Sequence, residues 1–163
     1  MAYRITDPLL GTQKIATNSP TAQHPLGTIV RATDPVYGAG EFIYLKGVAS
    51  TAVGSWVTYN PDDFSSTLLA ANAIGPVAIA MSACVANEYG WYQVQGKAVG
   101  KVAAGFVDNA NVYATATAGT ADDAIVAGDR VKGAVGASAI GTPSAGLAEM
   151  EIARPFMDDA VAA

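Results

Sequence analysis

The stretch GWYQVQGKA, Gly90 to Ala98, decides the fold class because it can be interpreted in two incompatible ways. A glycine followed by Gly-Lys suggests a phosphate-binding loop, whose pattern is Gly-x-x-x-x-Gly-Lys followed by Ser or Thr. Here five residues separate Gly90 from Gly96, and Ala98 follows Lys97. The intervening Trp-Tyr-Gln-Val-Gln favours an extended strand over a flexible loop that wraps phosphate. The stretch therefore indicates a β-strand and excludes a nucleotide site.

The two faces of this strand differ in polarity because its side chains alternate between them. One face is apolar and suits the core, and it carries Tyr92, Val94, Gly96 and Ala98. The other face carries Trp91, Gln93, Gln95 and Lys97. Polar side chains around a tryptophan are typical of a partly wet protein interface, and ordinary solvent exposure with one packed tryptophan is the alternative.

Further runs typical of β-strands alternate with turn signals along the chain, which predicts an all-β fold, either a compact barrel or a sandwich. The runs cover residues 26–32, 41–49, 54–60, 75–83, 90–100, 109–116, 128–139 and 146–154. Helix signals are weak, and the best candidate is Asp63 to Ala73, where Asp or Ser could cap a short turn. The sequence thus predicts a fold dominated by strands.

An internal echo links two of these runs. Phe42 to Ala49 matches Trp91 to Ala98 in pattern, at an offset of 49 residues. This similarity indicates two small tandem β units, residues 41–98 and 90–155, which share one strand. Generic β patterning is the alternative explanation.

The chain divides by composition into three parts. Residues 1–25 contain Pro, Thr and Gly without a sustained period, which predicts an extended arm that a lone monomer does not order by itself. Residues 26–157 predict a β-rich body, and residues 158–163 predict a loose acidic tail. No secretory signal peptide and no run of about 20 apolar residues is present, so no membrane partner is expected.

The surface composition favours association. Hydrophobic residues make up 51% of the 163 residues, but aromatic residues make up only 8%, because alanine occupies 33 positions. Charged residues make up 14%, against roughly 25% in ordinary globular proteins. A surface so poor in charge suggests that other copies of the chain, or a larger assembly, cover much of it.

The distribution of charge argues against nucleic acid as a partner. The net charge is −5, and residues 1–40 have a balance of +1 while the remainder has a balance of −6. Phosphate binding needs a basic patch, and single-strand binders interleave aromatic residues with Lys and Arg. The aromatic residues here lie among acidic and neutral neighbours, so we expect them to pack in the core and at interfaces.

Residues for catalysis or metal binding are scarce. His24 is the only histidine and has no nearby carboxylate to orient its ring, so a surface or docking role is expected. Cys84 is the only cysteine and suits a small apolar filler in a reducing compartment. The pairs Asp62-Asp63 and Asp122-Asp123 lack the spaced ligands of a calcium loop and suit solvated turns. We therefore expect no enzyme activity, no cofactor and no metal.

The segment HPLGTIVRATDPVYGAGEFIYLKGVA (residues 24–49), followed by VGSWVTYNPDDFSSTLLAANAIGPVAIAM (residues 53–81), resembles small capsid decoration (cement) proteins of tailed bacteriophages. The resemblance extends from His24 to about Gly100, with a looser match beyond, and consists of Gly-Val-Ala-rich β runs rather than a catalytic signature.

This resemblance implies a structural role on the virion. Such proteins are assembled in the bacterial host cytoplasm and bind the outside of a shell of major capsid protein, commonly as trimers. They hold the shell against internal DNA pressure, and their N-terminal arms often add a strand to a capsid sheet edge. The expected interface comprises the arm residues Ile5, Leu9, Leu10, Ile15 and His24, together with Trp91, Gln93, Gln95 and Lys97.

Two other functions remain open from the sequence. Tail-tube, baseplate and head-fibre proteins of phages are also β-rich, poor in charge and oligomeric. A carbohydrate-binding module or small enzyme on a β-sandwich is the alternative from a different class, although the chain offers no plausible acid/base pair.

Overall fold

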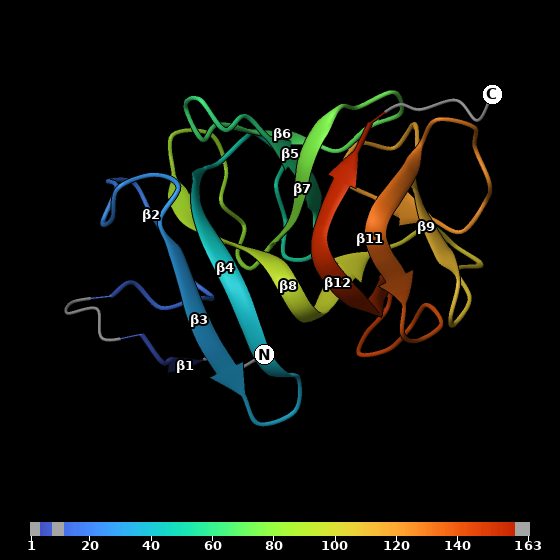
Figure 1. Ribbon diagram of the computed structural model, residues 1–163, viewed down its shortest axis with the longest axis horizontal. Coiled ribbons are helices and arrows are strands. Elements are labelled where there is room, and N and C mark those ends of the chain that lie inside the picture. The colour runs from blue at the N-terminus through green and yellow to red at the C-terminus, as the bar shows by residue number, and fades with distance from the viewer. Residues whose placement is uncertain (1–3, 8–11, 159–163) are drawn as a thin grey trace.

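The computed structural model describes residues 4–7 and 12–158, which form strands and loops (Figure 1). The strands among the described residues are β1 (Arg4–Ile5), β2 (Asn18–Ser19), β3 (Ile29–Asp34), β4 (Gly38–Lys46), β5 (Trp56–Tyr59), β6 (Ser66–Leu68), β7 (Gly75–Ala80), β8 (Tyr89–Lys101), β9 (Asn111–Ala114), β10 (Ala121–Asp122), β11 (Arg130–Gly136) and β12 (Leu147–Met157). The all-β prediction is therefore confirmed.

These strands form one antiparallel sheet in the order β1-β3-β4-β8-β7-β12-β11-β9-β10. Off this path, β2 pairs with β8, β5 pairs with β7, and β6 pairs with β5. Within the described chain the two end strands, β1 and β10, do not pair with each other, so the sheet does not close. The arrangement is compatible with a compact β-sandwich, one of the two predicted architectures.

Strand β8 lies between the two halves of the sheet, with β3 and β4 on one side and β11 and β12 on the other (Figure 1). It pairs with β4 from Tyr89 to Gly96 and with β12 from Gln95 to Lys101. The two segments that echo each other in the sequence, in β4 and β8, are thus antiparallel neighbours in the sheet. A single strand therefore joins the two halves through its backbone hydrogen bonds.

The two predicted β units do not have separate cores. Trp56 and Ile79 belong to the first unit in sequence, yet they share one buried cluster with Met150 and Ile152 of the second. On the opposite face of β5 and β7, Val57 and other side chains pack in a second cluster with Ile43 and Tyr92. The first cluster therefore joins the two units, whereas the second lies within the first unit.

The helix expected from Asp63 to Ala73 is absent, and this segment contains β6. The Asp63 carboxylate accepts hydrogen bonds from the backbone N–H and the hydroxyl of Ser65, at 2.9 and 2.7 Å, which fixes a turn instead of capping a helix. Residues Ser66 to Leu68 then pair with β5. A local capping preference has been overridden here by pairing within the sheet.

The N-terminal segment is not a free arm where the structure describes it. Ile15 is only 2% exposed and packs in a third buried cluster with Val30 and Phe42. β1 pairs with β3, β2 pairs with β8, and Ile5 packs half-buried against the same cluster. Leu9 and Leu10 lie outside the described residues. The expectation that this segment orders only on a partner is therefore wrong for residues 12–25, because the Ile15 side chain is part of the core.

At the C-terminus, Asp158 forms an ion pair with Lys132 of β11. The predicted loose tail, residues 158–163, therefore begins with a residue that is tied to the sheet, and residues 159–163 lie outside the described part of the chain.

We expect Gly96→Ala to lower the free energy of unfolding by about 3 to 4 kcal/mol. Gly96 has a φ of +102°, and a Cβ there would lie 2.5 Å from the carbonyl oxygen of Ala39. Gly105→Ala is the matched control, since Gly105 has a φ of +97° with open space around it, and about 1 to 2 kcal/mol is expected. Urea unfolding measures both, and equal losses would contradict the steric explanation.

We expect Ile15→Ala to lower the free energy of unfolding by about 2 to 4 kcal/mol, because it opens a cavity in the core. Ile29→Ala is the control, because Ile29 is 46% exposed, and its loss should stay below about 1 kcal/mol. The comparison uses chemical denaturation of both variants. A loss at Ile15 no larger than that at Ile29 would restore the free-arm interpretation.

Candidate functional site

Trp91 and His24, two predicted interface residues, act inside the molecule. Trp91 is fully buried, and its indole N–H donates to the backbone oxygen of Gln13 at 3.0 Å. The Tyr44 hydroxyl donates to Gln13 Oε1 at 2.6 Å, and the Gln13 backbone N–H donates to His24 Nε2 at 3.1 Å. The His24 ring lies 5.2 Å from the Tyr44 ring and 5.3 Å from the Trp91 ring. These contacts bind the N-terminal segment to the body.

Gln93, a third predicted interface residue, is also fully buried. Its side-chain amide donates to the backbone oxygens of Gln95 and Lys97, both at 3.1 Å. The side chain therefore holds the backbone of its own strand, in a place that a partner protein does not reach. The predicted contact face of Trp91 and Gln93 is wrong.

A β-bulge explains why the predicted alternation fails. Gln93 lies opposite Phe42, but Gln95 lies opposite Glu41, so Val94 is an extra residue on β8. An extra residue shifts the side chains that follow it relative to those before it. Gln95 is therefore exposed although Gln93 is buried, and the four residues of the predicted polar face do not lie together.

The other two residues of the predicted face, Gln95 and Lys97, are accessible to solvent. The Lys97 ammonium lies 2.7 Å from Glu149 Oε2 and 5.8 Å from the centre of the Tyr37 ring. The hydrogen bond to Glu149 raises the pKa of Lys97 above its usual value, so this side chain is a cation at every physiological pH. Half of the predicted face is thus available for contact with a partner.

The same surface carries an ion-paired carboxylate between two arginines. Glu41 forms ion pairs with Arg31, at 3.1 Å, and with Arg154. The Glu41 side chain is only 13% exposed, whereas the Arg31 and Arg154 side chains are 73% and 59% exposed. The carboxylate therefore positions two guanidinium groups that still face solvent, where they can donate to an acceptor on another protein.

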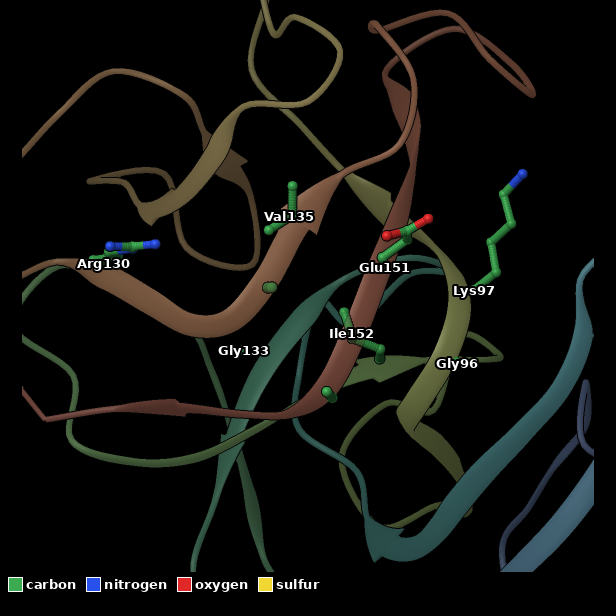
Figure 2. Close-up of a pocket in the computed structure, with 9 residues that line it drawn as sticks. Gly96, Lys97, Arg130, Gly133, Val135, Glu151 and Ile152 are labelled. Carbon is green, nitrogen blue, oxygen red and sulfur yellow. The ribbon is translucent and has the colours of Figure 1, made fainter.

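Two depressions lie on either side of Gly96. The β4 hollow has a volume of 320 Å³, and its lining includes Thr6, Arg31, Ala39, Gly40, Glu41 and Gln95. The β11 groove has a volume of 540 Å³, with an apolar lining of Gly96, Gly133, Ala134, Val135, Ile152 and Ala153. Its charged residues are Lys97, Arg130 and Glu151. Figure 2 shows Lys97 and Glu151 on one side of this groove and Arg130 on the other, with Val135 between them.

Irregular backbone on three neighbouring strands accompanies these depressions. Gly96 of β8, Arg154 of β12 and Gly133 of β11 all have positive φ, at +102°, +47° and +74°. A Cβ at Gly133 would lie 2.7 Å from the carbonyl oxygen of Ala153, so only glycine fits there. Glycine within a strand typically marks a bulge or a close approach of another backbone.

The charge of this outer surface differs from that of the rest of the chain. We call the two depressions and the charged residues in and beside them the outer surface; these charged residues are Arg31, Glu41, Lys97, Arg130, Glu149, Glu151 and Arg154. Its four basic and three acidic side chains give +1, whereas the remaining five basic and eleven acidic residues give −6. The Asp7 carboxylate, which accepts from the Arg31 backbone N–H at 2.7 Å, lies beside these residues, so basic and acidic groups are balanced on this face of an acidic protein.

Cys84 lies in the core and not on this surface. Burial raises the pKa of the Cys84 thiol to about 11, so it is a poor nucleophile at neutral pH. Over residues 4–7 and 12–158, no group of three or more His, Cys, Asp or Glu side chains is placed to hold a metal ion. No helix in the described part of the chain is long and apolar enough to cross a membrane.

Comparisons with protein-family models, curated proteins and solved structures give no match. The outer surface is therefore assigned from geometry and charge alone. Glu41 and Arg154 are 113 residues apart in sequence, and Gln13 and Trp91 are 78 apart, so no spacing pattern could have revealed either contact.

We expect Gln13→Ala to lower the free energy of unfolding by about 1 to 3 kcal/mol. The Gln13 amide accepts from Tyr44 and donates to the backbone oxygens of Thr17 and Tyr89, at 2.6 and 3.2 Å, and all three bonds are lost. Gln23→Ala is the control, because the Gln23 amide bonds only to exposed neighbours within four residues. Hydrogen exchange of residues 12–25 should accelerate only in Gln13→Ala, and equal exchange in both variants would refute the assignment.

Proposed function

We propose that this chain is a structural protein of a tailed-phage virion, a decoration protein that binds the outer surface of the major capsid shell. The resemblance to that family, from His24 to about Gly100, is the observation that carries the proposal. The low charged fraction of 14% and the outer surface with its two depressions support a protein that works by binding other proteins.

The β4 hollow is the part of the outer surface that we assign to the shell. In decoration proteins the N-terminal segment often contacts the capsid, and here Thr6 lines the hollow. The Thr6 backbone N–H donates to the Arg31 backbone oxygen at 2.9 Å, and Arg31 points a largely exposed guanidinium beside it. Exposed arginine and Gln95 beside an extended N-terminal segment suit hydrogen bonds to carboxylates and backbone oxygens of a shell protein.

Multivalency would supply the stabilising effect. A capsid presents many equivalent sites, so a modest contact at each site adds to a large stabilisation of the expanded shell. Because Ile15 and β2 are part of the body, the contact does not require residues 12–25 to leave it. The proposed mechanism is thus a preformed surface that clamps neighbouring capsid subunits.

Binding to phage heads that lack the protein tests this proposal. We expect Arg31→Glu to weaken co-sedimentation with heads at least about tenfold, or about 1.4 kcal/mol, because it removes a cation and repels Glu41. Lys46→Glu is the control, since Lys46 is exposed at the far end of β4 and should bind normally. A cryo-EM map of the virion that showed a few copies at the tail, or none on the shell, would contradict the proposal.

A further inference from the structure

The loop between β10 and β11 exposes four consecutive apolar residues, Ala124 to Ala127. Ile125 is 83% exposed and Val126 is 46% exposed. Such a run on a surface loop costs solubility and is unusual unless a partner covers it. The loop is therefore a candidate contact site rather than a simple connection.

Two aspartates hold the ends of this loop in place. Asp123 Oδ2 accepts from the Val107 backbone N–H at 2.9 Å. Asp129 is only 3% exposed, and its carboxylate accepts from the Asn72 backbone N–H at 2.6 Å. Because both ends are fixed before any partner arrives, docking would cost little conformational entropy.

The segments tied to the loop add two more aliphatic side chains. Val107, which donates its N–H to Asp123, is 54% exposed. Ile74 follows Asn72 by two residues and is 69% exposed. Both residues thus belong to segments that are hydrogen-bonded to the ends of the loop, and both expose apolar surface of the kind that marks protein contacts.

The β11 groove has the complementary properties. Its lining is mainly glycine, alanine and aliphatic residues, and its volume of 540 Å³ is enough for more than one aliphatic side chain. Arg130 and Lys97 stand on opposite sides of it (Figure 2). The charged lining of the groove, Lys97, Arg130 and Glu151, has a balance of +1. The loop is preceded by Asp122 and Asp123, a balance of −2, so the two surfaces carry opposite net charge.

We propose that the loop of one copy docks in the β11 groove of a second copy. Ile125 is too exposed to lie in the groove of its own chain, so the match can only be made between molecules. Two such contacts exchanged between two copies give a two-fold dimer, and a single contact repeated head to tail gives a closed ring or a filament. This inference does not rest on the capsid role, because purified protein alone must show the association.

Cysteine cross-linking tests which surfaces meet. Cys84 is buried, so Ile125→Cys and Val135→Cys each add one accessible thiol, with Val135 lying in the groove. We expect a mixture of the two single variants to form a disulfide-linked dimer under mild oxidation. Ile125→Cys mixed with Val36→Cys is the control, since Val36 is 74% exposed at the β3–β4 turn. Equal cross-linking in both mixtures, or none in the first, would overturn the proposal.

Light scattering at about 10 μM protein measures the association itself. We expect the unmodified chain to be larger than a monomer, and Ile125→Asp to raise the dissociation constant at least about tenfold. Val36→Asp serves as the control and should keep the size of the unmodified chain. A monomeric unmodified chain, or an unchanged Ile125→Asp, would overturn the proposal, and capsid binding by such a monomer would leave the capsid role standing.

Discussion

The change of partner along strand β8 is the constraint on which the sheet depends. At Gly96 the strand lies opposite Gly40 on one edge and Ile152 on the other, so both halves of the sheet meet at this residue. A Cβ at Gly96 would lie 2.5 Å from the Ala39 oxygen, and one at Gly40 would lie 2.9 Å from Gln93 Nε2. Two facing glycines therefore let one strand serve both halves.

The bulge next to Gly96 is the feature of β8 that could not be predicted from the sequence. Alternating polarity and turn residues were enough to predict the all-β fold and most strands, because both signals are local. The faces of β8 could not be predicted, since Val94 is an extra residue whose insertion changes no hydrophobic pattern. The Gln93 side-chain amide donates to the backbone on the far side of the bulge. In the sequence, Gln93 cannot be distinguished from an ordinary polar residue of a surface strand.

Contacts between distant segments account for the other differences from the sequence-based expectations. A Pro- and Thr-rich segment predicts an arm, but the burial of Ile15 depends on side chains of β3, β4 and β8 that only the folded sheet brings together. The outer surface also depends on contacts that only the folded sheet creates, because Glu41 forms ion pairs with Arg31 of β3 and Arg154 of β12. Gln95 is exposed, as alternation predicts for a polar residue on a strand, whereas Gln93 carries the same local signal and is buried.

The distortion at Gly96 links the architecture to binding. It lies between the β4 hollow and the β11 groove and contributes to the lining of both, so the backbone geometry that joins the two halves also shapes both depressions. Because the depressions lie on opposite sides of this residue, an occupant of one need not displace an occupant of the other. A protein that holds a shell through one depression and a neighbouring copy through the other would connect many weak sites into a continuous layer, which multivalency makes far more stable than any single contact.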